Sequence, residues 1–242
     1  MIDPFFHVHC LQEVDSTNER AKELARQGAP EGTVIVAATQ WAGRGRRGRS
    51  WSSPHGGLYF SLILRPPISP DLAPQLVLVT AACLYRALHR RGLPVSIKWP
   101  NDLVAGGKKL GGILVEAGSA SQSLSFLVVG VGVNINGPPP IEGGTSIEAL
   151  AGSPQQKEEI LADILGEMKR TYFAYLQEGI GPVLAEYRRG CTTLGREVII
   201  VGPKGGAPAK AVDIGERGEL FVEDLDGRRR SVFADEVSLR CG

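Results

Sequence analysis

Residues 95–116 read VSIKWPNDLVAGGKKLGGILVE, and this stretch carries the strongest indication of the fold. Its apolar start predicts a short buried strand that runs into the corner Lys98–Asp102, where a proline and two side chains able to bond backbone make a rigid turn. Leu103–Val104 and Leu110–Glu116 flank the turn Ala105–Gly107, a pattern typical of a β-hairpin. The stretch therefore predicts paired strands with a polar corner at one end.

Helices and strands alternate on both sides of this stretch. Before it we expect a helix, two strands and a strongly apolar helix, over residues 20–27, 33–38, 58–64 and 72–91. Ser16 and Glu19 have the spacing of a capping box for the first helix. After it we expect a strand over residues 124–133 and a short helix that Thr145 or Ser146 caps and that ends near residue 152. A long amphipathic helix over residues 153–177 and a second short helix over residues 181–189 should follow.

The character of the chain changes near Gly190. From Leu194 onward short strands alternate with glycine-rich turns, and we expect them over residues 197–201, 209–214, 220–225 and 230–233. Such close spacing is typical of a small β-barrel. We therefore predict two domains, residues 1–189 and 190–242.

The composition is that of an ordinary globular protein, with 43% hydrophobic and 22% charged residues. The net charge of +1 argues against a protein that coats nucleic acid, because such proteins usually carry a larger basic excess. The chain has no run of about 18 apolar residues and no signal peptide. We expect a cytoplasmic protein without a membrane partner.

The four cysteines are scattered and form no CxxC pair, so free thiols are expected rather than disulfides or a zinc site. His7 and His9 lie two residues apart, which is more often a surface strand pair than a metal site. We assign no metal-binding residue.

The segment Gly43–Arg49 reads GRGRRGR and follows a predicted strand. It matches the dinucleotide pattern GxGxxG, but the loop-forming residues after it do not open a helix, and no Gly-Lys-Ser/Thr of a phosphate-binding P-loop is present. Glycines let a backbone approach an anion, and closely spaced arginines supply forked donors for phosphate or carboxylate. The alternative is a solvated basic loop that contacts nucleic acid.

Three further features can carry chemistry, and each has a plain structural alternative. A lysine of the pair Lys108–Lys109 can enter a closed pocket, or both can be exposed in the hairpin. The alternate glycines Gly130 and Gly132 leave one face of a strand bare, so that something flat can lie there, or they serve close strand packing. Asn134 then offers both a donor and an acceptor.

Taken in order, these motifs resemble those of the biotin–protein ligases. The matching segments are Ser16-Thr17-Asn18, QWAGRGRRGR at 40–49, KWPND at 98–102, KLGGILVE at 109–116 and GVGVN at 130–134. The resemblance covers about residues 10 to 150 by motif and the remainder by organisation. It implies an α+β fold, with a class II synthetase-like catalytic domain made of a mixed β-sheet with helices, followed by a small SH3-like β-barrel.

The resemblance also implies a set of site residues. Biotin's ureido ring would be held by Ser16, Thr17, Asn18 and Gln40. Biotin's carboxylate and the adenylate phosphate would be held by Arg44, Gly45, Arg46, Lys109 and Gly112, with Lys108 as the neighbouring alternative to Lys109. Arg44, Arg46 and Lys109 would be catalytic. The nucleotide would be contacted by Arg44, Arg46, Arg49, Trp51, Asn101 and Asn134, and Asp102 would act as a base or anchor the corner.

By resemblance, the activity is the formation of biotinyl-AMP from biotin and ATP with Mg²⁺, followed by transfer to a lysine of a carrier protein. The biotin carboxyl carrier subunit of acetyl-CoA carboxylase is the implied partner, and a homodimer is expected. Because Ser-Thr-Asn begins at residue 16, we expect no winged helix, no specific DNA binding and no repressor role. Trp41 is bulkier than expected after Gln40. The competing hypotheses are a lipoate–protein ligase and a nucleic-acid-binding module.

Overall fold

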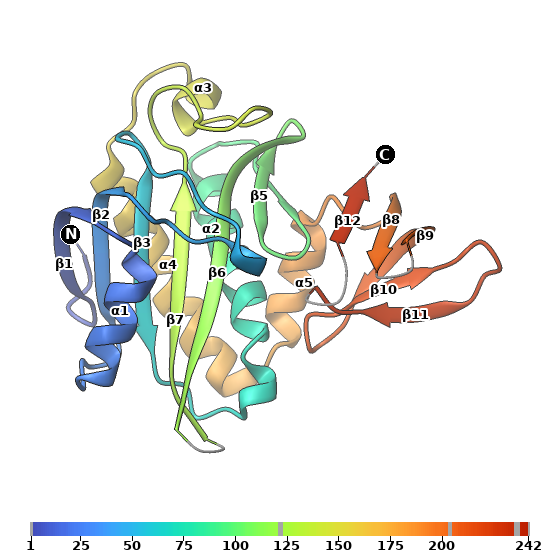
Figure 1. The fold of residues 1–242 in the computed structure, drawn as a ribbon, viewed down its shortest axis with the longest axis horizontal. Helices are drawn as coiled ribbons and strands as arrows, with labels where there is room; N and C mark the ends of the chain where they lie inside the picture. The colour runs from blue at the N-terminus through green and yellow to red at the C-terminus, as the bar shows by residue number, and fades with distance from the viewer. Residues whose placement is uncertain (1, 121–122, 203–204, 235–237, 242) are drawn as a thin grey trace.

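The computed structural model describes residues 2–120, 123–202, 205–234 and 238–241, and its strands form two sheets (Figure 1). The larger sheet has the order β1-β2-β3-β7-β6-β5-β4. Its strands are β1 (His7–Val14), β2 (Thr33–Gln40), β3 (Leu58–Leu64), β4 (Ser96–Lys98), β5 (Asp102–Ala105), β6 (Lys108–Ala120) and β7 (Ser123–Val133). Only β1 and β2 pair in parallel among these neighbours, so the sheet is mixed, as the resemblance implied.

Helices cover both faces of this sheet (Figure 1). On one face α1 (Thr17–Arg26) contacts β2, β3 and β7. On the other face α2 (Gln75–Arg90) lies against the strands and packs on α4 (Lys157–Glu178) and α5 (Gly181–Gly190). The short helix α3 (Ile147–Ala151) follows β7.

The central strands are mostly apolar because helices bury them on both sides. Successive strand residues face opposite sides of a sheet. Ile35 and Val128 therefore join the small core under α1, whereas their neighbours Val34 and Val129 join the large core with α2 and α4. This arrangement explains why the predicted strands read as continuous hydrophobic runs rather than alternating ones.

The β5–β6 hairpin predicted from the opening stretch is confirmed. Its turn residues Gly106 and Gly107 have φ angles of 56° and 77°, a conformation that glycine adopts without strain. The short helix ending at Gly152 is also confirmed, and Ser146 caps it by accepting from the Ala149 N–H at 3.3 Å.

The start of α1 differs from the capping-box prediction. Ser16 is the N-cap residue by backbone conformation, but its side chain makes no capping bond. Glu19 instead forms ion pairs with Lys22 and Arg44. Two cations draw this carboxylate away from the helix end, and the reciprocal bond of a capping box is lost. The helix also begins at Thr17, three residues before the predicted start.

The segment Pro70–Arg90 is long and apolar enough to cross a membrane by length and composition alone. In the structure most of it is α2, which is packed in the large core, and 61% of its apolar window is buried. Its hydrophobicity is therefore that of a core helix. The helix begins at Gln75 rather than at the predicted Leu72, because Pro70–Leu72 form a 3₁₀ turn.

The C-terminal strands form an antiparallel sheet in the order β11-β10-β9-β8-β12. They are β8 (Glu197–Gly202), β9 (Gly205–Ile214), β10 (Leu220–Glu223), β11 (Arg229–Val232) and β12 (Ser238–Cys241). A small C-terminal β-unit is thus confirmed, while its closure into a barrel and the boundary at residue 190 stay predictions.

The corner Lys98–Asp102 joins this small sheet to the larger one. Trp99 is buried, its backbone N–H donates to Thr193 Oγ1 at 3.0 Å, and its indole N–H donates to the Gly218 carbonyl at 3.0 Å. Tyr187 donates to the Pro100 carbonyl at 3.0 Å. The corner is therefore held from three sides, which makes it a rigid support for whatever its polar end faces.

A buried carboxylate ties α2 to α4. Glu167, whose side chain is 2% exposed, pairs with Arg86 at 2.7 Å, with Arg90 at 2.9 Å and with Arg170. Burial raises the pKa of Glu167, but the hydrogen bonds and charges of Arg170 and Arg86 outweigh it and bring the pKa below the usual 4.5.

Replacing Glu167 by glutamine should lower the free energy of unfolding at pH 7 by about 1–3 kcal/mol, because hydrogen bonds to a charged group are lost. A folded-state pKa below the unfolded one means that this stabilisation is present above about pH 4.5 and is lost as the pH falls through the folded value. Urea unfolding at pH 7 and below pH 4 checks both statements.

The matched control is Glu159→Gln on the same helix, because Glu159 is 66% exposed and its pair with Arg91 should contribute little. Equal effects of the two substitutions at pH 7, or a Glu167 effect that does not shrink in acid, would contradict the assignment.

Candidate active site

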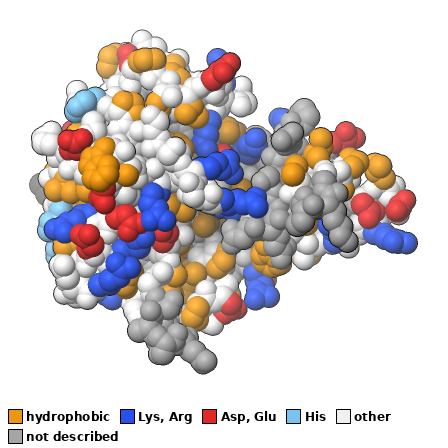
Figure 2. Space-filling model, in the orientation of Figure 1, with side chains coloured by type: hydrophobic (Ala, Val, Ile, Leu, Met, Phe, Trp, Pro, Cys, Tyr) orange, Lys and Arg blue, Asp and Glu red, His pale blue; other side chains and the backbone are white. Residues whose placement is uncertain are grey.

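A cavity of about 660 Å³ opens on the face where Lys and Arg side chains gather near its centre (Figure 2). It is lined by parts of α1, β2, the loop Gly43–Arg49 (called the arginine loop below), the corner Lys98–Asp102, β6 and β7. All site residues named from the sequence line it, namely Ser16, Thr17, Asn18, Gln40, Arg44, Gly45, Arg46, Arg49, Trp51, Asn101, Lys109, Gly112 and Asn134. Segments far apart in the chain therefore meet in one place.

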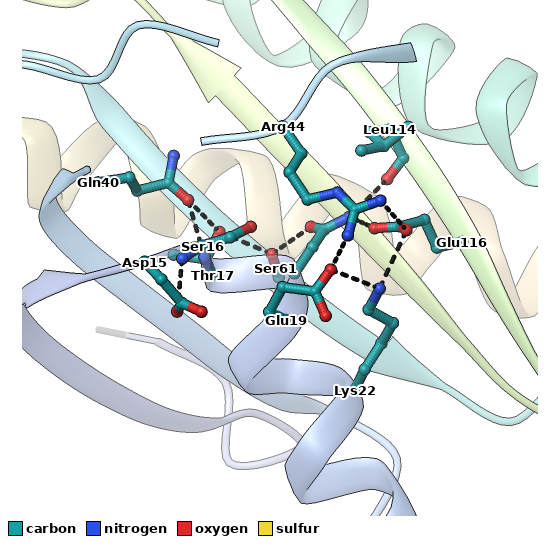
Figure 3. A network of polar contacts seen from close by, with 11 residues as sticks. Asp15, Ser16, Thr17, Glu19, Lys22, Gln40, Arg44, Ser61, Leu114 and Glu116 are labelled. Carbon is teal, nitrogen blue, oxygen red and sulfur yellow. Dashed lines mark hydrogen bonds and ion pairs between the residues drawn. The ribbon is translucent and has the colours of Figure 1, made fainter. Parts of the chain in front are cut away.

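One wall of the cavity is made of neutral polar groups from the start of α1 and the end of β2 (Figure 3). Gln40 Oε1 accepts from the Thr17 backbone N–H at 2.7 Å and lies 3.1 Å from Thr17 Oγ1. The Gln40 amide donates to Ser53 Oγ at 2.8 Å. The wall offers fixed hydroxyl and amide groups, which suit a neutral ligand with both donors and acceptors.

The wall continues behind Thr17 through residues whose roles the sequence did not reveal. Ser61 Oγ lies 2.6 Å from Asn18 Oδ1 and 2.8 Å from Thr17 Oγ1, and Asn18 Nδ2 donates to Glu116 Oε2 at 2.8 Å (Figure 3). Ser61 is fully buried. The available signal was a lone serine in the middle of the apolar strand LYFSLIL, residues 58–64.

The arginine loop is a compact turn rather than the opening of a nucleotide-binding helix. Only a 3₁₀ turn, Arg46–Gly48, follows the first glycines, and Arg49 returns to extended backbone. The Gly45 N–H donates to the Arg49 carbonyl at 2.7 Å, and the Trp51 N–H donates to the Gly43 carbonyl at 2.8 Å. The prediction that this GxGxxG match does not open a dinucleotide-binding helix is therefore confirmed.

The two arginines expected to be catalytic contact opposite walls of the cavity. Arg44, 48% exposed, pairs with Glu19 and lies 3.6 Å from Glu116, whereas Arg46 donates to Asn101 Oδ1 at 3.2 Å. The carboxylates at Arg44 occupy positions that an anionic ligand would compete for, because a guanidinium binds both in the same forked geometry.

Lys109 points into the cavity and Lys108 does not line it, so the geometry favours Lys109 of the two alternatives. Its ammonium lies 2.7 Å from Asp102 Oδ1 and 5.2 Å from the centre of the Trp51 ring. Asp102 is thus engaged in an ion pair, which fits an anchoring role, and its action as a base stays a hypothesis.

The flat group expected against the bare glycine face is the indole of Trp51. A Cβ atom at Gly132 would lie 2.5 Å from Trp51 Nε1, and one at Gly112 would lie 3.1 Å from its ring carbon Cζ3. Gly112 and Gly132 face each other across the β6–β7 ladder, so the two bare positions form one floor. The indole N–H is buried and has no hydrogen-bond acceptor among the residues that the structure describes. A third glycine, Gly130, makes room for Asn18, whose Oδ1 would lie 2.0 Å from its Cβ.

Asn101 and Asn134 hold the backbone of the cavity wall. Asn101 Nδ2 donates to the Ile113 carbonyl at 2.7 Å, and the buried Asn134 Nδ2 donates to the Thr145 carbonyl at 3.0 Å. Their contact with a nucleotide stays a prediction.

Trp41, the bulky residue after Gln40, does not enter the cavity wall. Its side chain is 71% exposed, so the structure accommodates its bulk by pointing it to solvent.

Among the described residues no group of three or more histidine, cysteine or acidic side chains could hold a metal ion. Asp102 supplies the one carboxylate among the described residues that line the cavity. A metal ion here would need most of its oxygen ligands from a bound substrate, as Mg²⁺ does at phosphates.

The fold and the cavity together define an α+β catalytic domain that can hold a neutral polar head group at one wall and an anion at a cationic loop. Residues 10–134, more than half of the chain, match the family described as biotin/lipoate A/B protein ligases. The chain belongs to this family and is an enzyme of it.

Three similar proteins match this chain over almost its whole length. It is 36% identical over 232 residues to the biotin–[acetyl-CoA-carboxylase] ligase of Paracoccus denitrificans, which covers 90% of this chain and 95% of that ligase. It is 34% identical over 230 residues to the bifunctional ligase/repressor BirA of Bacillus subtilis (strain 168), with coverages of 92% and 71%. The solved biotin protein ligase of Aquifex aeolicus in complex with biotin and ATP superposes with a TM-score of 0.84 at 32% identity, with coverages of 98% and 99%. The family resemblance found in the sequence is confirmed.

Gly132→Ala should displace Trp51 from the cavity floor, because the new methyl group would lie 2.5 Å from the indole nitrogen. In a Trp41→Phe background, the remaining tryptophans are Trp51 and the buried Trp99. Acrylamide quenching of the fluorescence should therefore increase.

Gly166→Ala in α4 is the control, because nothing lies within 4 Å of a Cβ there. Quenching by acrylamide that is the same in the Gly132 and Gly166 variants would show that the indole does not rest on Gly132.

Proposed function

We propose that this enzyme is a biotin–protein ligase, which makes biotinyl-AMP from biotin and ATP and transfers the biotinyl group to a lysine of a carrier protein. The proposed acceptor is the biotin carboxyl carrier subunit of acetyl-CoA carboxylase, in line with the name of the Paracoccus relative. The observation that carries the proposal is the single cavity that combines a hydroxyl and amide wall with a cationic loop and lysine.

The neutral wall suits the ureido ring of biotin. A urea has one carbonyl acceptor and two N–H donors, and Thr17, Asn18 and Gln40 supply both kinds of partner from buried or half-buried positions. A site built from such groups rejects analogues that leave its buried polar atoms unpaired. Ser16 lines the same wall.

The cationic side suits the acid end of biotin and the nucleotide phosphate. In the first step, the biotin carboxylate attacks the α-phosphorus of ATP and pyrophosphate leaves. Arg44, Arg46 and Lys109 stand where negative charge develops, so that they act by electrostatics and need no proton transfer. When the ligand binds, Arg44 exchanges its ion pairs with Glu19 and Glu116 for contacts with the ligand. Lys109 exchanges its ion pair with Asp102 in the same way.

In the second step, the amine of the carrier lysine attacks the acyl carbon of biotinyl-AMP, and AMP leaves. The adenylate is a mixed anhydride that water can hydrolyse, so the arginine loop must shield it until the amine arrives. Mg²⁺ would enter with the ATP phosphates and neutralise their charge, with Asp102 as the nearest carboxylate on the protein side.

The small C-terminal sheet is proposed to be an SH3-like barrel that begins near residue 190. Ala234, which follows β11, lines the cavity, so the C-terminal part of the chain reaches the site. We also propose that the enzyme works in the cytoplasm and, with a net charge of +1, has no specific DNA site. A gel shift on operator-like DNA with tight, specific binding would contradict the last point.

The test of the proposed function is incubation with biotin, MgATP and a carrier domain, followed by intact-mass analysis of the carrier. One added biotinyl group per carrier domain is expected, and lipoate in competition should not replace it. Because the family includes lipoate ligases, a carrier that gains lipoyl mass instead would replace the proposed substrate. No mass increase with either acid would overturn the proposal.

Lys109→Ala should lower the rate of biotin-dependent ATP–pyrophosphate exchange by about 100-fold, the scale of one preorganised electrostatic group. Lys108→Ala is the matched control, because Lys108 is exposed and does not line the cavity. Exchange at the wild-type rate in the Lys109 variant would count against its role.

Arg46→Gly should let biotinyl-AMP escape, because the loop loses the side chain that reaches Asn101 across the cavity. Release of labelled adenylate after rapid gel filtration measures the leak. Arg46→Lys keeps the charge without the forked donors and should leak less than the glycine variant. Adenylate retained equally by all three proteins would refute the shielding role.

A further inference from the structure

We infer that Glu116 is a positioning residue that sets the hydrogen-bond polarity of the biotin wall through Asn18 and Ser61, so that Thr17 presents an acceptor to a ligand N–H. These four residues, Glu116, Asn18, Ser61 and Thr17, are called the polar relay below, and Figure 3 labels Glu116, Ser61 and Thr17. The inference rests on the proposed function, because it assigns the recognised group to the ureido ring of biotin.

The relay begins at a charged acceptor. Glu116 lies on β6 with a side chain 20% exposed, and it accepts hydrogen bonds from Asn18 at 2.8 Å and Lys22 at 3.1 Å. Burial raises the pKa of Glu116, but the hydrogen bonds from Asn18 and Lys22 and the charges of Lys22 and Arg44 outweigh it and lower the pKa. At neutral pH the group is therefore a carboxylate, which can accept but cannot donate.

A carboxylate at this position determines which way the Asn18 amide points. The NH₂ group must face Glu116, where the Leu114 carbonyl, another acceptor, lies 3.4 Å away. The carbonyl oxygen of Asn18 must then face Ser61, because the two ends of an amide lie opposite each other. Gly130 leaves room for the amide in this place.

The direction of the next two hydrogen bonds follows by elimination. Asn18 Oδ1 can only accept, so the hydroxyl of Ser61 donates to it at 2.6 Å. Ser61 then has only lone pairs for Thr17 Oγ1 at 2.8 Å, and Gln40 Oε1 at 3.1 Å is also an acceptor. The Thr17 hydrogen is used inside the wall, which leaves an oxygen lone pair for an N–H in the cavity.

Glutamine at position 116 would weaken this constraint, because a side-chain amide can donate as well as accept, and the Leu114 carbonyl at 3.4 Å would be the remaining acceptor for the Asn18 NH₂ group. Asn18 could then turn over, Ser61 could donate to Thr17, and the threonine could present either polarity. We expect Glu116→Gln to raise the dissociation constant for biotin about tenfold, the scale of one net hydrogen bond. The effect on the dissociation constant for biotin should exceed the effects on the KM for ATP and on kcat, because Glu116 bonds Asn18 at 2.8 Å but lies 3.6 Å from the guanidinium of Arg44.

Ser61→Ala breaks the same relay between Asn18 and Thr17. It leaves the carboxylates of Glu19 and Glu116 in place. It should weaken biotin binding to a similar extent, and adding Glu116→Gln to it should weaken binding no further. Residues that act through one chain of hydrogen bonds are non-additive in this way, whereas independent residues are additive.

Glu19→Gln is the matched control for charge. Glu19 also pairs with Lys22 and Arg44, but it makes no hydrogen bond to Asn18. If Glu116 acted only as a counter-ion for these cations, the two glutamine variants would change the dissociation constant for biotin equally.

The experiment is calorimetric titration of biotin into wild type, the three single variants and the Glu116–Ser61 double variant, with steady-state kinetics on each. An unchanged biotin dissociation constant in Glu116→Gln, an equal loss in Glu19→Gln, or full additivity in the double variant would overturn the inference. If Glu116→Gln does not fold, an unchanged dissociation constant for biotin in Ser61→Ala is sufficient to overturn the inference. Wild type that binds no biotin would instead be a failure of the proposed function.

Discussion

Where β6 and β7 pair, three glycines leave one face of the sheet without side chains, and the other parts of the site are built on this face. Gly112 lies opposite Gly132 in the ladder, and Gly130 follows on the same face. Side chains there would collide with Asn18 and Trp51, at 2.0 Å from Gly130 and 2.5 Å from Gly132. Because these positions are empty, α1 can approach the sheet and an indole can lie flat on it, which creates the neutral wall and the cavity beside it.

The charged side of the cavity follows a different rule, since two of its cations, Arg44 and Lys109, are paired with carboxylates of the protein itself. Arg44 pairs with Glu19 and Glu116, and Lys109 pairs with Asp102. An empty site with several unpaired cations would repel itself, and these carboxylates remove that cost. A bound anion then exchanges one set of ion pairs for another, which keeps binding reversible and leaves the cations where charge develops during reaction.

Local patterns predicted most elements, and the family resemblance supplied the assigned cavity residues, but local patterns failed where two segments compete for one side chain. The β5–β6 hairpin follows from its Gly-Gly turn, and the strand containing residues 58–64 follows from its apolar run. The capping box failed because Glu19 is drawn to Lys22 and Arg44, and a residue 25 positions away is invisible to a local rule. Strand β1 was foreseen only at His7 and His9, because an exposed edge strand needs no apolar pattern.

The order of motifs along the chain was enough to indicate the family, the mixed fold and a set of residues that all line one cavity, because each motif must supply the same backbone shape and chemistry wherever it occurs. Only the tertiary structure decided how these groups are paired. Ser61 and Glu116 sit on strands that meet Asn18 solely through the packing of α1 on the sheet. Hydrogen-bond direction depends on which acceptor faces which donor in space, and no spacing along a single chain encodes that relation.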